Sequence, residues 1–299
     1  MFKKLLLAML ALTLVTSVAL SGQKYKVFLV TMDQTDQHWN NVDAGAKKAA
    51  DELGNIDYTW SAPDMKDDAK QIEIINNCVA GGADLLLLAA NGPTAVTAAL
   101  READSQGVKI IYVDSPADFN AIATFSTNNK AAGHTAGEEM IKALKAAGKT
   151  SGKIGIVNVN ASTASAVLRE EGFREALAGS PYELLATQYA EGDAARSKDV
   201  ASNFITNGCV GVYGTNEGST TGVGTANLEA KNSIICVGFD NSDSIRSLIK
   251  GGSLVCAMVQ DPFAMGYKGM NGAGAALAGG YNGPKVVDTG VIVMTKDKL

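Results

Sequence analysis

Residues 234–240 read IICVGFD, an apolar run that ends in a single carboxylate at Asp240. Two further apolar runs end in a similar way, VGVYGTN at Asn216 and LVCAMVQ at Gln260. Continuous apolar runs are typical of strands buried in a parallel sheet, and ligands bind beyond the carboxyl ends of such strands. We therefore expect Asn216, Asp240 and Gln260 to converge on one rim. These side chains suit an uncharged, polyhydroxylated ligand and indicate binding rather than catalysis.

Strand and helix patterns alternate along the whole chain around this segment. The pattern includes helices at 93–106 and 263–278, a strand at 182–189 and a final strand at 285–294. This alternation predicts an α/β fold with parallel sheets. About eleven strands divide better into two sheets than into one, given the usual size of domains. Because no linker rich in Pro or Ser separates the halves, we expect the chain to cross between two lobes several times.

Length, composition and charge fit a globular protein of about two domains. The chain has 299 residues, and a domain usually has ~150. Hydrophobic residues make up 46% and charged residues 19%, which is too apolar for a disordered chain. The net charge is −5 and the basic residues form no stripe, so nucleic acid is not an expected partner.

The first 22 residues have the pattern of a secretory signal peptide. Lys3 and Lys4 form its charged start, residues 5–15 are apolar, and small residues around Ala19 offer a cleavage site. An amphipathic helix is the alternative, but the segment lacks a polar face. We expect export to the periplasm or the cell exterior. Residues 20–22 also resemble the run before a lipidated cysteine, so a membrane tether would require a Cys in place of Gln23 in the native protein.

The four cysteines, Cys78, Cys209, Cys236 and Cys256, lack the spacing of a zinc or redox site. They are interpreted as small buried apolar residues. Cys236 and Cys256 each lie four residues before the end of a strand-like run, which places them at similar heights in the sheet. One disulfide between adjacent strands therefore stays open as an alternative, which an exported location would permit. The disulfide state of Cys209, Cys236 and Cys256 is not fixed by the sequence.

The loop after the first strand contains Asp33, Asp36, His38 and Trp39 within seven residues. An indole ring can cover the C–H face of a sugar, and carboxylates accept hydrogen bonds from neighbouring hydroxyls. The alternative is a solvated loop in which Trp39 packs against the first helix. Tryptophan is scarce, with 2 in the chain, which favours a binding role for this one.

Paired carboxylates can also hydrolyse glycosides, so Asp33 and Asp36 raise the possibility of an enzyme. Both lie on one short loop, whereas a hydrolase needs its pair on opposite sides of the scissile bond. The chain has no G-x-S-x-G motif and no dinucleotide fingerprint, and its two histidines accompany no obvious nucleophile. We therefore expect a protein that is not an enzyme and that uses no cofactor and no metal.

Three further residues are candidates for the same rim. Asp114 ends another strand and either accepts hydrogen bonds from ligand hydroxyls or caps the following turn. Asn91 lies in an Asn-Gly-Pro sequence that is also good turn chemistry. Arg169 lies within a predicted helix, where it is either a surface residue or a donor to the ligand. A further functional role would be to neutralise a buried carboxylate such as Asp33, because an unpaired buried carboxylate is costly.

In their order along the chain, these features resemble the periplasmic sugar-binding proteins of the ribose-binding type, the soluble receptors of ABC importers. The resemblance covers residues from Tyr25 to the C-terminus. It rests on features that are weak singly and specific together, which are listed in order: His38-Trp39 before Asp43-Ala44-Gly45-Ala46; Asp114 after a hydrophobic strand; Thr127-Asn128-Asn129 before Ala136-Gly137-Glu138; Arg169 four residues before Phe173; Asn216; Val237-Gly238-Phe239-Asp240; and Gln260.

This resemblance implies two similar, doubly wound parallel-sheet lobes joined by a three-segment hinge, with crossovers near Thr127, Gln260 and Pro284. The first lobe would comprise residues 24–127 and 261–284, and the second lobe residues 128–260 and 285–299. A sugar would bind between them, stacked on His38 and Trp39. The expected ligand-binding residues are Asp33, Asp36, His38, Trp39, Asn91, Asp114, Thr127, Arg169, Asn216, Asp240 and Gln260.

The chain also departs from that family's pattern. Ser115 stands where ribose-type members usually have an arginine, and Asp36-Gln37-His38-Trp39 replaces Asn-Pro-Phe-Phe. An aromatic residue expected near Gly192 is missing. These differences leave the identity of the sugar open.

The leading hypothesis is a secreted, monomeric receptor that hands a monosaccharide-like solute to an ABC permease in the membrane. A second hypothesis is a sensor that presents its ligand to a chemoreceptor, or that takes part in autoinducer-type signalling. The third is an exported sugar-processing enzyme that depends on Asp33 or Asp36. The sequence does not decide which permease is used, whether transport or signalling is the role, or whether the cell envelope is Gram-negative or Gram-positive.

Overall fold

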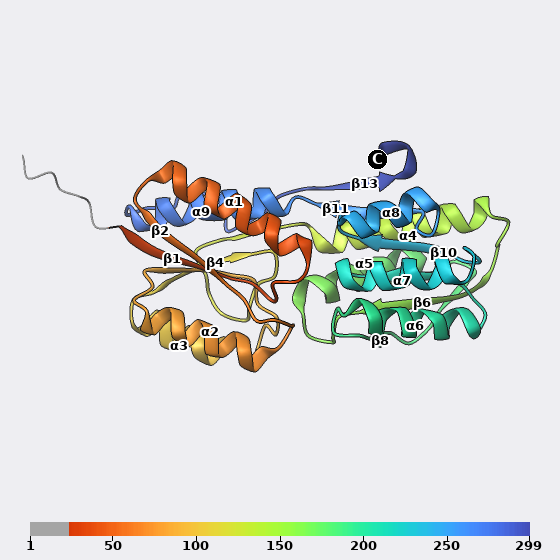
Figure 1. The fold of residues 1–299 in the computed structure, drawn as a ribbon, viewed down its shortest axis with the longest axis horizontal. Coiled ribbons are helices and arrows are strands. Elements are labelled where there is room, and N and C mark those ends of the chain that lie inside the picture. The colour runs from red at the N-terminus through yellow and green to blue at the C-terminus, as the bar shows by residue number, and fades with distance from the viewer. Residues whose placement is uncertain (1–23) are drawn as a thin grey trace, which may run out of the picture.

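A computed structural model describes residues 24–299, which form two α/β lobes joined end to end (Figure 1). The expected signal peptide and Gln23 lie outside the described residues. Segments far apart in the sequence lie side by side, because helix α9 (Pro262–Leu277) returns to the first lobe and packs along α1 (Gln37–Leu53) (Figure 1). The chain therefore crosses between the lobes more than once, as the sequence predicts.

The first lobe contains a parallel sheet in the order β12-β5-β4-β3-β1-β2. Its strands are β1 (Tyr25–Val30), β2 (Ile56–Ser61), β3 (Leu85–Leu88), β4 (Lys109–Val113), β5 (Thr124–Ser126) and β12 (Val286–Asp288). Residues of α1 and α9 form the hydrophobic core on one face, and residues of α2 (Asp68–Ala80) and α3 (Thr97–Ser105) form the core on the other.

The central strand β3 shows why this sheet is parallel and covered on both faces. Its four leucines are fully buried, and they alternate between the two cores, with Leu85 and Leu87 on one face and Leu86 and Leu88 on the other. A strand with apolar side chains on both faces must be covered by helices on both sides. The carboxyl ends of β1, β3 and β4 then meet at one edge, which faces the second lobe.

The second lobe repeats this topology, with the strand order β13-β11-β10-β9-β6-β7 and with β8 also paired to β6. Its strands are β6 (Gly152–Asn158), β7 (Tyr182–Leu184), β8 (Gln188–Tyr189), β9 (Cys209–Gly214), β10 (Ile235–Phe239), β11 (Cys256–Gln260) and the antiparallel β13 (Val291–Thr295). The helices are α4 (Asn129–Ala146), α5 (Ala164–Leu177), α6 (Ala194–Thr206), α7 (Glu217–Glu229) and α8 (Asp243–Gly251), followed by the 3-10 turn η1 (Lys296–Lys298). The prediction of two similar doubly wound lobes is confirmed.

Glycines let the helix pair behind each sheet approach closely. A Cβ atom on Gly266 of α9 would lie 1.9 Å from the carbonyl oxygen of Val42 in α1. In the second lobe, a Cβ on Gly133 of α4 would lie 2.0 Å from the carbonyl oxygen of Arg169 in α5. Any larger residue would therefore push these helices apart. This close packing brings the start of α4 next to Arg169 and so helps to build the site described below.

Three element boundaries differ from the prediction. The strand expected at 285–294 is two strands, of which β12 pairs with β5 in the first lobe and β13 pairs with β11 in the second. The chain turns between them at Gly290, which has a φ of 89°. The last crossover therefore lies near residue 290 rather than near Pro284, and residues 286–288 belong to the first sheet. The remaining lobe limits stay our assignment.

The other two differences are local. Residues 182–189 form the separate strands β7 and β8, and the helix expected from residue 93 begins at Thr97 after a run of turns. The segment 263–278 is one continuous helix despite its glycines. Gly266, Gly269 and Gly272 pack against neighbouring elements and do not mark a bend in the helix.

All four cysteines are free and buried. Burial raises the pKa of Cys78 to about 11 and that of Cys256 to about 12. In the register of β10 and β11, Val237 rather than Cys236 lies opposite Cys256. Cys236 and Cys256 therefore face opposite sides of the sheet and belong to different cores. The cross-strand disulfide between them, kept open as an alternative, does not form because a one-residue offset reverses the side-chain direction.

Candidate functional site

The candidate site lies where the carboxyl ends of the two sheets face each other. The loops after β1 and β4 supply it from the first lobe, and the loops after β6, β9, β10 and β11 supply it from the second. Two neighbouring cavities lie there, the inner cavity of about 30 Å³ and an outer one of about 160 Å³. Both have His38, Asp240 and Gln260 in their walls. Spaces of this size restrict any guest to a small molecule.

Eight of the eleven residues expected from the sequence line the inner cavity together. They are Asp36, His38, Trp39, Asp114, Arg169, Asn216, Asp240 and Gln260. They come from both lobes and from six separate segments of the chain. Whether each contacts a ligand stays a prediction, but the structure brings all eight to one place.

Asp33 does not line the cavity, because the protein already uses both of its oxygens. Its Oδ1 accepts hydrogen bonds from the backbone N–H of Thr35 at 2.7 Å and of Asp36 at 2.9 Å, and from the Thr35 hydroxyl. Its Oδ2 accepts from the Trp39 indole at 3.1 Å and from Lys66. Asp33 is 1% exposed. It therefore holds the loop in shape and orients the Trp39 ring.

Lys66 is the cation that compensates this loop, and sequence reasoning missed it. Its ammonium lies 2.5 Å from Asp33 Oδ2 and 2.8 Å from Asp36 Oδ2, and its side chain is 6% exposed. Burial raises the pKa of Asp33, but the charge and hydrogen bond of Lys66 outweigh it, so the pKa lies below the ordinary value. Burial keeps the pKa of Asp36 above its ordinary value despite Lys66. The expectation that Arg169 neutralises Asp33 is therefore wrong.

Arg169 instead organises the cavity wall of the second lobe. Its guanidinium donates to the Asn129 side chain at 2.8 Å, to the Thr215 carbonyl at 3.0 Å and to Gln260 Oε1 at 2.7 Å. It also stacks over the Phe239 ring, 4.3 Å from the centroid. The carboxylate nearest to it is Asp114 of the first lobe, at 3.9 Å. The planar guanidinium thus fixes the orientation of Gln260 through a rigid fork.

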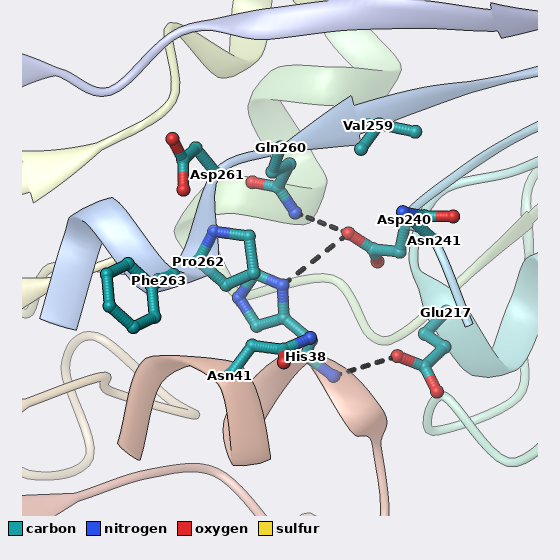
Figure 2. A pocket seen from close by; sticks show the side chains of 10 residues that line it. All are labelled: His38, Asn41, Glu217, Asp240, Asn241, Val259, Gln260, Asp261, Pro262 and Phe263. Carbon is teal, nitrogen blue, oxygen red and sulfur yellow. Dashed lines mark hydrogen bonds and ion pairs between the residues drawn. The ribbon is translucent and has the colours of Figure 1, made fainter. Parts of the chain in front are cut away.

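Asp114 and Asp240 occupy matching positions at the ends of β4 and β10. Both have left-handed backbone conformations, with φ of 61° and 75°, which are uncommon for residues other than glycine. Strain of this kind gathers at binding sites, where it aims a side chain. Asp240 Oδ1 accepts a hydrogen bond from Gln260 Nε2 at 2.6 Å (Figure 2). The two carboxylates therefore face the cleft from opposite lobes.

His38 lies between these two carboxylates. Its Nε2 is 3.0 Å from Asp114 Oδ2, and its Nδ1 is 3.6 Å from Asp240 Oδ1. Its ring meets the Trp39 ring edge-on, with centroids 4.7 Å apart. Burial lowers the pKa of His38 and the charge of Arg169 lowers it further. The contact with Asp114 and the charges of Asp114 and Asp240 outweigh both and raise the pKa to about 8.

Asn216 lines the inner cavity and carries a side-chain donor without a partner among residues 24–299. Its Oδ1 caps α7 by accepting from the Ser219 N–H at 3.1 Å. Its Nδ2 is buried and, among the described residues, has no hydrogen-bond partner. A buried polar group without a partner costs free energy, so this N–H marks a place where a ligand oxygen would bind.

Glu217, the next residue, joins the two lobes and was also missed from the sequence. Its carboxylate accepts from the backbone N–H of Gln37 at 2.9 Å, at the start of α1. It also accepts from the backbone N–H of His38 at 3.0 Å (Figure 2). In return, Gln37 Oε1 accepts from the Asp243 N–H of α8 at 3.2 Å. Burial, with the charges of Asp36 and Asp240, raises the pKa of Glu217 to about 7.

Asn91 and Thr127 lie near the cavity but not in its wall. The Asn91 carbonyl accepts a hydrogen bond from the Thr163 hydroxyl of the second lobe at 2.8 Å, so it contributes a contact between the lobes. The Thr127 hydroxyl donates to the Gly290 carbonyl at 3.4 Å, where two crossovers run together. Both residues therefore support the lobe arrangement rather than facing the central space.

Within residues 24–299, no cluster of three or more His, Cys, Asp or Glu side chains is placed to hold a metal ion. Across that same range, no helix combines the length and apolar character required to cross a bilayer.

Comparison with known proteins matches residues 27–280 to the family model described as periplasmic binding protein domain. The ribose import binding protein RbsB of Escherichia coli (strain K12) is 27% identical over 279 residues, covering 89% of this chain and 92% of that protein. RbsB of Haemophilus influenzae is 29% identical over 239 residues, covering 79% of this chain and 80% of the relative.

Among solved structures, a carbohydrate transporter solute-binding protein from Agrobacterium radiobacter, in complex with D-arabinose, is similar. Its TM-score is 0.87 at 29% identity, over 93% of this chain and 96% of that one. An ABC transporter solute-binding protein from Agrobacterium vitis with bound D-fucose gives a TM-score of 0.83 at 26% identity, over 91% of this chain and 96% of that one.

Proposed function

This chain belongs to the periplasmic binding protein domain family, and we propose that it is a receptor that delivers a monosaccharide-like ligand to an ABC importer. One observation carries the proposal. Hydrogen-bonding side chains from both lobes, including the unpartnered Nδ2 of Asn216, face one small cavity beside the Trp39 ring. The named activities of the similar proteins, which are ribose import and D-arabinose and D-fucose binding, agree with it.

Each wall of the cavity offers a different contact to a sugar. The Trp39 indole supplies a flat face for the C–H groups of a sugar. Asp33 holds that ring in place by accepting a hydrogen bond from the Trp39 Nε1–H. Asp114 and Asp240 accept hydrogen bonds from neighbouring hydroxyls, one from each lobe. Asn216 Nδ2 and Arg169 donate to hydroxyl or ring oxygens. A ligand held in this way touches both lobes at once.

Closure of the lobes is the proposed working step. The bonds from Glu217 to the start of α1, from Asp243 to Gln37 and from Thr163 to Asn91 all join the first lobe to the second. They form only when the lobes are together, so the structure has the closed arrangement. A ligand that contacts both lobes binds the closed form better and shifts the population towards it.

The receptor would work in the periplasm, as the description of the matched family suggests, and its partner would be a permease in the membrane. No contact among residues 24–299 favours catalysis by the first loop. Asp33 accepts five hydrogen bonds, one of them from a lysine, so it is not free to act as a general acid or base. A binding role is therefore the function that the site supports best.

A thermal-shift panel tests this proposal. The protein would be heated with D-ribose, D-apiose, D-allose, D-arabinose, D-fucose and D-tagatose in turn. A ligand at ~100 times its Kd should stabilise the protein by ~2.7 kcal/mol, which is a rise of roughly 5–10 °C in Tm. Asp240→Asn is the binding-site variant for comparison, since Asn tolerates the left-handed backbone but removes the charged acceptor, so sugar should raise its Tm less than that of wild type. A panel in which no sugar raises Tm would contradict the proposal.

A further inference from the structure

The closed cleft gathers more negative than positive charge. Asp36 and Asp114 approach it from the first lobe, and Asp240 and Glu217 from the second. Lys66 is already engaged by Asp33 and Asp36, and the Arg169 guanidinium lies 3.9 Å from Asp114. In the part of the chain from residue 24 onward, no Lys or Arg nitrogen comes within 4.0 Å of the Asp240 or Glu217 carboxylate. Bringing the lobes together therefore places carboxylates near one another without enough cations.

His38 occupies the place where this imbalance is greatest. One ring nitrogen lies 3.0 Å from Asp114 of the first lobe, a charge contact without hydrogen-bond alignment, and the other lies 3.6 Å from Asp240 of the second lobe. A neutral imidazole has one N–H and one acceptor nitrogen, whereas the protonated ring has an N–H on both. Since a carboxylate only accepts, the neutral ring would turn a lone pair towards one of the two. Only the cation complements both.

We propose that His38 is an affinity-determining residue that takes up a proton when the lobes close and, as a cation, joins Asp114 to Asp240 across the cleft. The proposal rests on the proposed function, because it needs a cleft that closes on a ligand. It goes beyond that function, because it makes the strength of binding depend on pH.

The other groups packed around His38 set how far its charge is stabilised. The positive charge of Arg169, on α5, opposes protonation of His38. Trp39, which follows His38 on α1, contacts the imidazole ring edge-on and carries no charge. Glu217 of α7 accepts from the His38 backbone N–H, so a carboxyl group that is mostly ionised only above about pH 7 lies close by. Asp36 precedes it in the loop and is itself paired with Lys66. The balance favours the cation, which agrees with a His38 pKa of about 8 in the closed form.

The direction of the pH effect follows from this balance. In the open form the imidazole is solvated, with an ordinary pKa near 6.5, whereas closure raises the pKa to about 8. A group whose pKa is higher in the closed form stabilises that form fully below about pH 6.5 and loses the effect as the pH rises through 8. Sugar affinity should therefore fall on the order of tenfold between about pH 6 and pH 9.

Isothermal titration calorimetry of the full chain tests this. The protein would be titrated with D-ribose, D-arabinose and D-fucose at pH values from about 6 to 9, in buffers that differ in ionisation enthalpy. His38→Phe keeps an aromatic ring without a titrating group, and His38→Gln serves as a second variant if the first folds poorly. His134→Gln is the matched control, because His134 is the other histidine and lies half-exposed on α4, where its Nδ1 is 3.7 Å from Glu138.

Wild type and His134→Gln should bind with proton uptake near pH 7.5 and lose about tenfold in affinity towards pH 9. His38→Phe should take up fewer protons and lose most of the fall between pH 7 and pH 9. Binding that is independent of pH in wild type, or a pH profile that His38→Phe leaves unchanged, would overturn the inference and leave the proposed function standing. No binding of any of the three sugars at any pH would overturn both.

Discussion

Asp33 of the first lobe and Asn216 of the second are both buried polar residues in loops that follow a sheet strand, but their hydrogen bonding differs. Asp33 is saturated, with both oxygens occupied by Thr35, Asp36, Trp39 and Lys66. Asn216 uses its oxygen to cap α7 and leaves its Nδ2, in a residue that lines the cavity, without a partner in the described part of the chain. All of the hydrogen bonds of the Asp33 carboxylate are made within the protein, whereas Asn216 keeps one donor that could bind a ligand.

This contrast separates residues that shape the site from residues that contact a ligand. The loop of the first lobe is rigid before any ligand arrives, because the bonds of Asp33 fix both the backbone and the Trp39 ring. A preorganised aromatic surface loses little entropy on binding. The second lobe supplies hydrogen-bonding atoms that gain a partner only when a ligand is present. Substitutions in the two places should therefore affect stability and binding differently.

The largest effect is expected for Asp33→Asn, measured as loss of stability without any sugar. The neutral amide would leave Lys66 with one carboxylate fewer and would turn an NH₂ towards the Trp39 and Lys66 donors. Breaking a buried pair costs about 3–5 kcal/mol, and the remaining Asp36 contact favours the lower end. Thermal unfolding should show a fall of roughly 6–12 °C in Tm.

Asp64→Asn is the matched control, since it makes the same chemical change in the exposed pair of Asp64 with Lys70. Exposed pairs contribute less than about 1 kcal/mol, so this variant should melt close to wild type. If Asp33→Asn unfolds at the wild-type temperature but no longer binds sugar, Asp33 contacts the ligand directly and the contrast with Asn216 disappears.

The intermediate effect is expected for Asn216→Ser, measured as loss of affinity with little loss of stability. Serine caps a helix about as well as asparagine, so α7 keeps its first hydrogen bond. The Nδ2 donor to the cavity is lost. One such hydrogen bond contributes about 1 kcal/mol or somewhat more, so the Kd should rise roughly tenfold in calorimetric titration.

Asn216→Ala provides the comparison within the same position. It removes both the cap and the donor, so it should lose affinity to a similar extent and lose about 1 kcal/mol of stability as well. An Asn216→Ser protein that binds sugar with wild-type affinity would show that Nδ2 faces the cavity without serving a ligand.

The sequence predicts the fold and much of the site for one physical reason. In a doubly wound sheet the carboxyl ends of the strands share one edge, so a polar residue at the end of an apolar run is brought to that edge. Asp114, Asn216, Asp240 and Gln260 were all found in this way. The family resemblance then placed two such edges face to face, and the structure agrees.

The residues that were missed lack any local pattern of this kind. Lys66 lies in the loop between β2 and α2, where nothing in the neighbouring residues distinguishes it from exposed lysines such as Lys70. Glu217 was missed because an acidic residue directly after the helix cap Asn216 is ordinary at the start of a helix and predicts no contact with the other lobe. The turn at Gly290 was missed because β12 and β13 are both β-rich, so their division between two sheets depends on tertiary pairing.

The smallest effect is expected for Glu217→Gln, which bears on how the second lobe meets the first. The pKa of Glu217 is raised to about 7 in the closed form, above the ordinary 4.3 of a solvated glutamate. Protonation therefore favours closure, fully below about pH 4.3, and the effect is lost as the pH rises through 7. The neutral amide resembles the protonated acid, so in calorimetric titration between about pH 6 and pH 7 wild-type affinity should fall several-fold more than that of Glu217→Gln, which keeps only the fall due to His38.

Glu229→Gln controls for the lost charge on the same helix, because Glu229 pairs with Lys198 on the exposed face of α7. It should keep the wild-type pH profile. The variants also distinguish two ways in which Glu217 could join the lobes. If Glu217→Gln binds more weakly than wild type at every pH with an unchanged profile, the charged carboxylate anchors the start of α1 favourably. In that case the two N–H groups of Gln37 and His38 outweigh the burial that raises the Glu217 pKa, and His38 alone would account for the proton uptake on closure.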